Sequence, residues 1–290
     1  MYSKFDFHLH TQWSYDALSM VEDYFKLAKE RGVKYIAITE HHHMDSYPEV
    51  KEVAKRYPEV KHIPAAEMTV WCPLGTYDLV CLGMPETPTP ELQAVFDEYH
   101  QWQRDAGDGV CKAVQLAGFP YTREDRMKLL KSYRPQHIID VQGCTHVRGC
   151  FQKEYLVDKM HYFKDAAEMN EAISRAKTVP HYPEAAKVIP VFKKAGALVL
   201  IAHPRSYFHE KDVERMDALR EMLQLDGAEC NQTDMTPELT AFYREYCVKY
   251  GMLSSAGCDA HTFGPECKLG TIIGDDVWLE EILDRLPQYR

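Results

Sequence analysis

The feature that most constrains this chain is the position of its histidines and acidic residues relative to its strand-like segments. His8 and His10 close an apolar run near the N-terminus, and Glu40 and His41 follow the run KYIAIT. Parallel strands that alternate with helices in a barrel open their carboxyl ends onto one face, where active sites lie. The pattern therefore predicts one metal site built from distant residues. The other candidates placed in this way are Glu67, His203 after ALVLIA, Asp259 and His261.

Strand-like and helix-like segments alternate on both sides of a central stretch. Before residue 90 the expected strands are 4–9, 34–39, 62–66 and 77–83, with helices over 19–31 and 49–57. After residue 184 the expected strands are 197–202, 227–230, 252–256 and 271–273, with helices over 184–195, 212–224 and 237–249. Repeated strand–helix units predict a mostly parallel sheet with helices outside it. We therefore expect an α/β fold that closes into a barrel.

The central stretch reads as mainly helical. Helices are expected near 91–116, 123–133 and 163–177, and Gly107 and Gly109 are expected to interrupt the first of them. We therefore expect residues 1–89 and 184–290 to form a barrel domain, and residues 90–183 to form a helical insertion subdomain.

Composition excludes several classes of protein. The chain has 290 residues, a formal net charge of −10 and nine cysteines without a C-x-x-C pair. This argues against a disulfide framework, a cysteine zinc site and broad affinity for long nucleic acids. No apolar run is long enough to span a membrane, and the N-terminal residues lack the apolar core of a signal peptide. We therefore expect a cytoplasmic location and no membrane partner.

The spacing of His8 and His10 has a direct chemical meaning. Residues i and i+2 of a strand point to the same side, so both imidazoles would face the barrel interior. Imidazole is a good ligand for Zn²⁺, Mn²⁺ or Fe²⁺. The spacing alone is weak, since a buried, hydrogen-bonded histidine beside an unrelated one gives the same pattern. The companion residues at the other strand ends favour a metal site.

Five motifs in order, FHLHTQWSYDA, ITEH, AAE, LIAHP and CDAH, resemble those of the PHP (polymerase and histidinol phosphatase) family. The resemblance implies a distorted (β/α)7 TIM-like barrel, here with a helical insertion. It also implies a metal-dependent phosphoric ester hydrolase with two to three divalent ions, which would be Mn²⁺, Fe²⁺ or Zn²⁺.

The resemblance also implies a role for each matching residue. The first ion would be held by His8, His10, Glu67 and Asp259, and Glu67 would bridge to a second ion bound by His203. The third ion would be held by Asp16, His41 and His261. Five of these residues would be catalytic, namely His8, His10, Glu67, His203 and Asp259.

Two positions depart from the family pattern. Glu40 stands where the family often has aspartate, and we expect it to orient a ligand histidine. Asp78 stands where the family commonly has a histidine ligand. As a ligand it would favour Mn²⁺ or Mg²⁺ over Zn²⁺. Alternatively the second site is weakly filled, or Asp78 is a solvated carboxylate at a strand end.

The segment THVRGCFQKEYL, with KVIPVFKKAGALVLIAHP after it, resembles the family branch that acts on nucleoside 3′,5′-bisphosphates and short oligonucleotides. That branch presents basic residues to the substrate phosphate, which suggests His146, Arg148 and Arg205 as substrate-binding residues. Each could equally be a solvated or ion-paired surface residue.

The expected reaction is hydrolysis of a phosphate monoester or diester by a metal-bound hydroxide. The substrate would be a small phosphorylated molecule, such as a nucleotide, a short oligonucleotide or another metabolite. Three alternatives stay open, namely an amidohydrolase-like C–N hydrolase, a non-catalytic metal-binding module and a histidinol-phosphate phosphatase.

Overall fold

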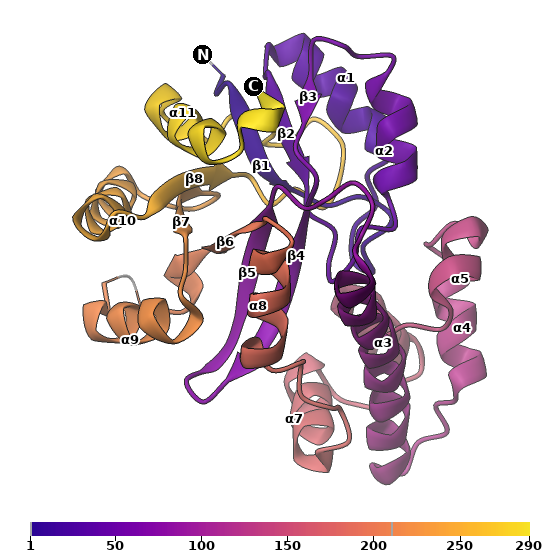
Figure 1. The fold of residues 1–290 in the computed structure, drawn as a ribbon. Coiled ribbons are helices and arrows are strands. Elements are labelled where there is room, and N and C mark those ends of the chain that lie inside the picture. Colours follow the sequence, from indigo (N-terminus) through magenta and orange to yellow (C-terminus); the bar gives the residue numbers. More distant parts are fainter. Residues whose placement is uncertain (1, 210) are drawn as a thin grey trace.

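The computed structural model describes residues 2–209 and 211–290, and its strands form two sheets (Figure 1). In the first sheet β1 (Phe5–Leu9), β2 (Tyr35–Ile38) and β3 (Lys61–His62) are parallel and lie in that order. The second sheet has the order β4-β5-β6-β7-β8. Its strands are β4 (Ala65–Cys72), β5 (Gly75–Leu82), β6 (Leu198–Ile201), β7 (Gly227–Gln232) and β8 (Leu253–Gly257).

Two isolated bridges join the sheets into a ring. Leu9 pairs with Ala260 beyond β8, and His41 pairs with Glu67 of β4. The backbone N–H of Asp259 also donates to the carbonyl of His8 at 2.9 Å. Candidate ligands such as His41 and Glu67 therefore lie at the seams of the ring, while Asp78 in β5 and His203 after β6 come from the middle of the second sheet. The α/β barrel class expected from the sequence is confirmed.

The expectation of a mostly parallel sheet is wrong for the middle of the second sheet. β5 runs antiparallel to both β4 and β6, and only the β6–β7 and β7–β8 pairs are parallel. The predicted strand 62–66 is in fact the end of β3 and the start of β4. Glu67 is therefore the third residue of a long strand that continues past the site, because β4 and β5 form an extended hairpin (Figure 1). The segment 271–273, expected as a strand, has no strand structure.

Helices cover the outside of the ring (Figure 1). One of them, α10, begins with the signal Thr-Pro-Glu-Leu, which also begins α3 of the insertion. The Thr236 side chain accepts from the N–H of Leu239, and the Thr89 side chain accepts from that of Leu92. Such caps satisfy the free N–H groups of a first turn. The outer helices are α1 (Val21–Arg31), α2 (Tyr47–Ala54), α8 (Ala185–Lys194), α9 (Val213–Leu223), α10 (Pro237–Tyr250) and α11 (Asp276–Arg285).

The stretch between β5 and α8 is helical and lies to one side of the ring (Figure 1). It has two small hydrophobic clusters of its own, one around Tyr121 and Leu156 and one around Leu130 and Ile139. Its division from the barrel as a separate subdomain stays a prediction. Its helices are α3 (Pro90–Leu116), α4 (Arg123–Lys131), α5 (Gln136–Gln142), α6 (Gly149–Lys153), η1 (Glu154–Lys159) and α7 (Ala166–Ala176).

The expected interruption of the first insertion helix is wrong, because α3 is continuous through both glycines. A Cβ at Gly107 would lie 2.7 Å from the Arg126 guanidinium, and one at Gly109 would lie 2.5 Å from the Thr178 carbonyl oxygen. The glycines therefore allow close packing and do not end the helix. Among the described residues, no helix is both long and apolar enough to span a bilayer.

Candidate metal centre

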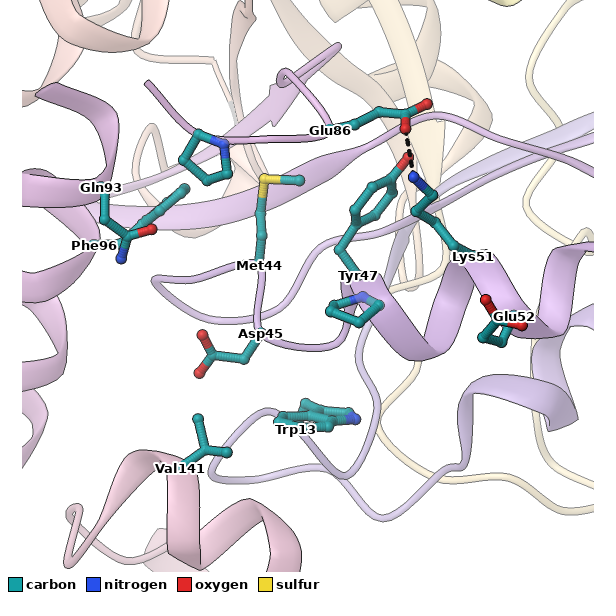
Figure 2. Close-up of a pocket in the computed structure, with 12 residues that line it drawn as sticks. Trp13, Met44, Asp45, Tyr47, Lys51, Glu52, Glu86, Gln93, Phe96 and Val141 are labelled. Atoms are coloured by element: carbon teal, nitrogen blue, oxygen red, sulfur yellow. Dashed lines mark hydrogen bonds and ion pairs between the residues drawn. The ribbon is translucent and has the colours of Figure 1, made fainter. Parts of the chain in front are cut away.

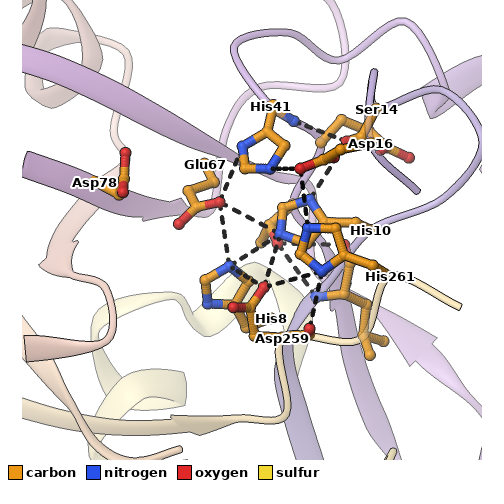
Figure 3. A network of polar contacts seen from close by, with 12 residues as sticks. His8, His10, Ser14, Asp16, His41, Glu67, Asp78, Asp259 and His261 are labelled. Carbon is orange, nitrogen blue, oxygen red and sulfur yellow. Dashed lines mark hydrogen bonds and ion pairs between the residues drawn. The ribbon is translucent and has the colours of Figure 1, made fainter. Parts of the chain in front are cut away.

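Four side chains from β1, β4 and the segment after β8 converge on one point (Figure 3). His8 Nε2 lies 3.1 Å from His10 Nε2, 3.3 Å from Glu67 Oε2 and 3.4 Å from Asp259 Oδ1. His10 Nε2 lies 3.3 Å from Glu67 Oε2 and 3.2 Å from Asp259 Oδ1. Ligand atoms ~2.0–2.1 Å from a tetrahedral ion stand ~3.3–3.4 Å apart. The spacing of this group therefore fits one divalent ion.

The second carboxylate oxygen of Glu67 faces another group. Glu67 Oε1 lies 3.1 Å from His203 Nε2, which in turn lies 3.6 Å from Asp78 Oδ2. Because the two oxygens of Glu67 face different groups, this carboxylate is placed to bridge two ions. The Tyr207 hydroxyl donates to Asp78 Oδ2 at 2.6 Å, so Asp78 lies within the site and is not freely solvated.

A third group surrounds Asp16, from the loop after β1. Its Oδ2 lies 3.3 Å from His41 Nε2 and 3.3 Å from His261 Nε2. The rings of His41 and His261 stack on that of His10, with centroids 4.3 and 4.4 Å away. The nine residues expected to bind metal therefore form one continuous cluster. Three sets of side chains within it bring their ligand atoms close enough to hold an ion, namely His8–His10–Glu67, Glu67–Asp78–His203 and His10–His41–His261. Their role as ligands stays a prediction.

Asp16 Oδ1 and His203 Nδ1 are buried, and neither has a hydrogen-bond partner among the described residues. His41 Nδ1 and Asp259 Oδ1 are also buried and face other candidate ligands, at 3.1 Å from Glu67 Oε2 and 3.2 Å from His10 Nε2. Buried polar atoms are nearly always satisfied by a partner. The spacing, the oxygen and imidazole donors and these unsatisfied atoms together fit bound divalent cations.

The electrostatics of the cluster point the same way. Burial lowers the pKa of His8, but the carboxylates of Glu229 and Glu67 outweigh burial and raise its pKa well above the usual value. Burial likewise opposes ionisation of Glu67, yet His8 and His41 hold its pKa well below the usual value. The carboxylates therefore attract cations strongly, and a metal ion would displace protons from the imidazoles.

Glu229, in the middle of β7, was not expected from the sequence. Its Oε1 lies 2.9 Å from His8 Nδ1, and its Oε2 accepts the backbone N–H of His203 at 2.7 Å. It therefore fixes the ring of one candidate ligand and the backbone of another. A Cβ at Gly257 would lie 2.3 Å from the Cβ of His8 and 2.8 Å from Glu229 Oε1, so only glycine allows this contact.

The surroundings of Glu40 match the orienting role expected for it. The fully buried carboxylate accepts from the Ser14 hydroxyl at 2.6 Å and from Thr11. Ser14 Oγ lies 3.3 Å from His10 Nδ1 and accepts the backbone N–H of His41 at 3.0 Å. Glu40 thus contacts the candidate ligands through Ser14.

Two candidate ligands have left-handed backbones, with φ of 27° at His203 and 54° at Asp259. Non-glycine residues in this region store on the order of 1–3 kcal/mol of strain. Both residues follow the ends of strands, β6 and β8, and with this backbone conformation their side chains reach the cluster.

The three residues expected to bind substrate lie at different distances from the cluster. Arg205 lines the same pocket of about 400 Å³ as His203 and Asp259. The ring of His146 lies 3.9 Å from that of Tyr15, which packs 5.1 Å from His41. The Arg148 guanidinium lies over the Phe151 ring, and among the described residues no hydrogen bond or ion pair joins it to a candidate ligand.

A second pocket, about 700 Å³ and mostly apolar, lies outside the cluster (Figure 2). Its walls include Trp13, Met44, Tyr47, Phe96 and Val141, and none of the nine candidate ligands lines it. The chemistry expected from the sequence therefore belongs to the cluster and not to this pocket.

Comparison with known proteins gives a family match over more than half of the chain. The model of the PHP domain matches residues 6–179. A curated relative, the DNA polymerase III PolC-type of Lacticaseibacillus paracasei, is 46% identical over 50 residues, which cover 17% of this chain and only 4% of that protein.

Two solved structures resemble the whole chain. A predicted metal-dependent phosphoesterase from Bifidobacterium adolescentis has a TM-score of 0.72 at 21% identity, covering 97% of this chain and 96% of that one. An amidohydrolase from Chromobacterium violaceum, with bound sulfate and no metal, has a TM-score of 0.69 at 18% identity, covering 92% of this chain and 90% of that one. At these identities the likeness establishes the fold.

Proposed function

The chain belongs to the PHP domain family, and from this premise we propose that it is a metal-dependent phosphoesterase. Its substrate would be a phosphate monoester or diester of a small, nucleotide-like molecule. The observation that carries the proposal is the close spacing of His8, His10, Glu67 and Asp259, which fits a single ion. Bound divalent ions would lower the pKa of water and neutralise charge on the phosphoryl oxygens.

The charge of the site supports an anionic substrate. Two divalent ions would neutralise the four carboxylates among the candidate ligands, and a third ion would make the site cationic. Asp16, Glu67, Asp78 and Asp259 would hold the ions, while Glu229 keeps His8 oriented. The protein as a whole carries a net charge of −10, so attraction of a phosphate would be confined to this site.

We infer that two side chains would orient the phosphate. The Arg205 guanidinium donates through Nη1 to the carbonyl of Asp234 at 2.6 Å, which leaves its other N–H groups for a substrate oxygen. His146 Nδ1 is buried and has no hydrogen-bond partner in the described part of the chain, and burial lowers the pKa of this imidazole to about 4. His146 would therefore act as a neutral hydrogen-bonding group, and Arg148 would contribute by side-chain movement.

The test is phosphate release from a panel of nucleotides, nucleoside bisphosphates, short oligonucleotides, histidinol phosphate and aryl phosphates with Mn²⁺. We expect turnover that His8→Ala abolishes. His161→Asn is the matched control, because it removes an exposed histidine of the insertion and asparagine tolerates its φ of 52°. Amide cleavage without phosphate release would contradict the proposal, as would metal uptake without any turnover.

A further inference from the structure

The loop that carries Asp16 is held from two sides. On one side, Ser14 contacts His10, Glu40 and the backbone of His41, and Asp16 contacts His41 and His261. Side chains 14 and 16 therefore face the metal centre.

On the other side, the carbonyls of the alternate residues, 13 and 15, accept hydrogen bonds from the insertion. The carbonyl of Trp13 accepts from Arg134 Nη2 at 2.9 Å and from Gln142 Nε2 at 3.2 Å. The carbonyl of Tyr15 accepts from the Tyr133 hydroxyl at 3.0 Å. The donors are 118 to 129 residues away in sequence.

The loop that carries His41 is held in the same way. Gln103 of α3 donates through Nε2 to the carbonyl of His41 at 3.1 Å. The insertion thus bonds the backbone of two of the three segments that form the Asp16–His41–His261 group. It also bonds β4 beyond Glu67: the Tyr99 hydroxyl donates to the carbonyl of Thr69, and the carbonyl of Pro183 accepts the backbone N–H of Trp71 at 3.0 Å.

Arg134 is the unusual member of this set. Its side chain is buried, with 4% of the residue exposed, and its Nε hydrogen-bonds to none of the described residues. Among the described residues no carboxylate lies within ion-pair distance of its guanidinium. Burying a cation without a paired carboxylate is costly. Its remaining hydrogen bonds go to Thr145 Oγ1 at 3.2 Å and Gln142 Oε1 at 2.5 Å. They hold the Arg134 guanidinium in the orientation in which it donates to the carbonyl of Trp13.

We propose that Tyr133 and Arg134 are positioning residues through which the insertion controls metal occupancy at the Asp16–His41–His261 group alone. The other candidate ligands lie on or beside β1, β4, β5, β6 and β8, which the ring itself holds in place. The inference rests on the proposed metal centre. Loosening the loop displaces Asp16 and weakens one ion without affecting the others.

The experiment measures Mn²⁺ binding by equilibrium dialysis with the full chain carrying Tyr133→Phe or Arg134→Met. Tyr121→Phe is the matched tyrosine control, since no described residue hydrogen-bonds its buried hydroxyl. Arg126→Met is the matched arginine control, since the hydrogen bonds of this buried guanidinium to described residues stay within the insertion, at Asp108, Cys111 and Cys144. Thermal unfolding checks that each variant is folded.

We expect Tyr133→Phe and Arg134→Met to lose affinity for one Mn²⁺ equivalent by about 10- to 100-fold, as other changes around ligand side chains do. The controls should keep all equivalents. In an Asp16→Asn background, Tyr133→Phe should have no further effect, because both changes act on the same ion.

Equal weakening of every equivalent, unchanged binding, or effects that add to Asp16→Asn would overturn this inference while leaving the proposed function standing. A wild-type protein that binds no Mn²⁺ would overturn both.

Discussion

At the scale of single residues, Glu229 is the contact that best separates an organised metal centre from a chance cluster. Its two oxygens accept from His8 Nδ1 and from the backbone of His203. In Glu229→Gln, one of the two donors would face an amide N–H. We expect Mn²⁺ affinity to fall by about 10- to 100-fold with the fold retained, as measured by competition with a chelator.

The matched control for this change is Glu221→Gln, an exposed glutamate of α9. Unchanged Mn²⁺ affinity in a folded Glu229→Gln protein would show that His8 does not depend on this carboxylate.

The residues that could be predicted from the sequence are those in short motifs after strand-like runs. For example, His8 and His10 are two residues apart, and side chains with this spacing in a strand point to the same face. Glu229 has no such signal, because it stands alone in the segment GAEC and its partner lies 221 residues away. Gly257 could not be assigned for the same reason: what requires glycine there is the approach of β1, which appears only in three dimensions.

At the scale of elements, Gly109 tests why α3 tolerates glycine. Gly109→Ala should gain about 1 kcal/mol of helix propensity. The new Cβ would, however, lie 2.5 Å from the carbonyl oxygen of Thr178, and such overpacking costs ~1–3 kcal/mol. We expect a net loss of up to about 2 kcal/mol in the free energy of unfolding, measured by denaturant titration.

Gly149→Ala is the control, because a Cβ at Gly149 meets open space. A stabilised Gly109→Ala protein would mean that the contact between α3 and the segment after α7 is loose.

Most helices and strands were predictable because hydrophobic periodicity and helix caps are local signals, as at the two Thr-Pro-Glu-Leu helix starts. Whether neighbouring strands run parallel or antiparallel was not predictable. The β4–β5 hairpin turns at Pro73 and Leu74, which lack the Asn-Gly or Asp-Gly signal of a tight turn. Without that signal, the two segments read as further members of a parallel series.

At the scale of the whole molecule, the free energy of unfolding should decrease as the pH falls below about 6.5. His62 Nε2 accepts the backbone N–H of Ile38 at 3.3 Å, and burial lowers the pKa of His62 to about 3. In the unfolded chain His62 takes up a proton near pH 6.5. The stability that the neutral, buried imidazole contributes is therefore complete above that pH and is lost as the pH falls toward 3.

His62→Gln keeps a hydrogen-bond acceptor but does not titrate. Between pH 6.5 and 4 the wild type should lose roughly 1–3 kcal/mol more stability than this variant, after allowance for partial solvent exposure. Urea unfolding across this range measures the difference. If the free energies of unfolding of the wild type and His62→Gln changed with pH in the same way, His62 would have to be protonated in the folded protein.

The ring of strands explains why the whole site was predictable in outline. The seams of the ring are made by His41 with Glu67 and by Leu9 with Ala260, so closing the barrel and assembling the cluster are the same event. A sequence that places histidines and carboxylates at these strand ends therefore predicts that they meet once the barrel closes. The contribution of the insertion was not predictable, since Tyr133 and Arg134 act through backbone carbonyls and leave no motif.

The measurement that tests the account most directly is the number of metal ions per chain, by mass spectrometry after Mn²⁺ loading and removal of free metal. The three groups around Glu67, Asp16 and His203 predict two to three ions in the wild type, and a reduced number in Glu67→Gln. A wild-type protein that retains one ion at most, or a Glu67→Gln protein that retains the full number, would contradict a bridged metal centre.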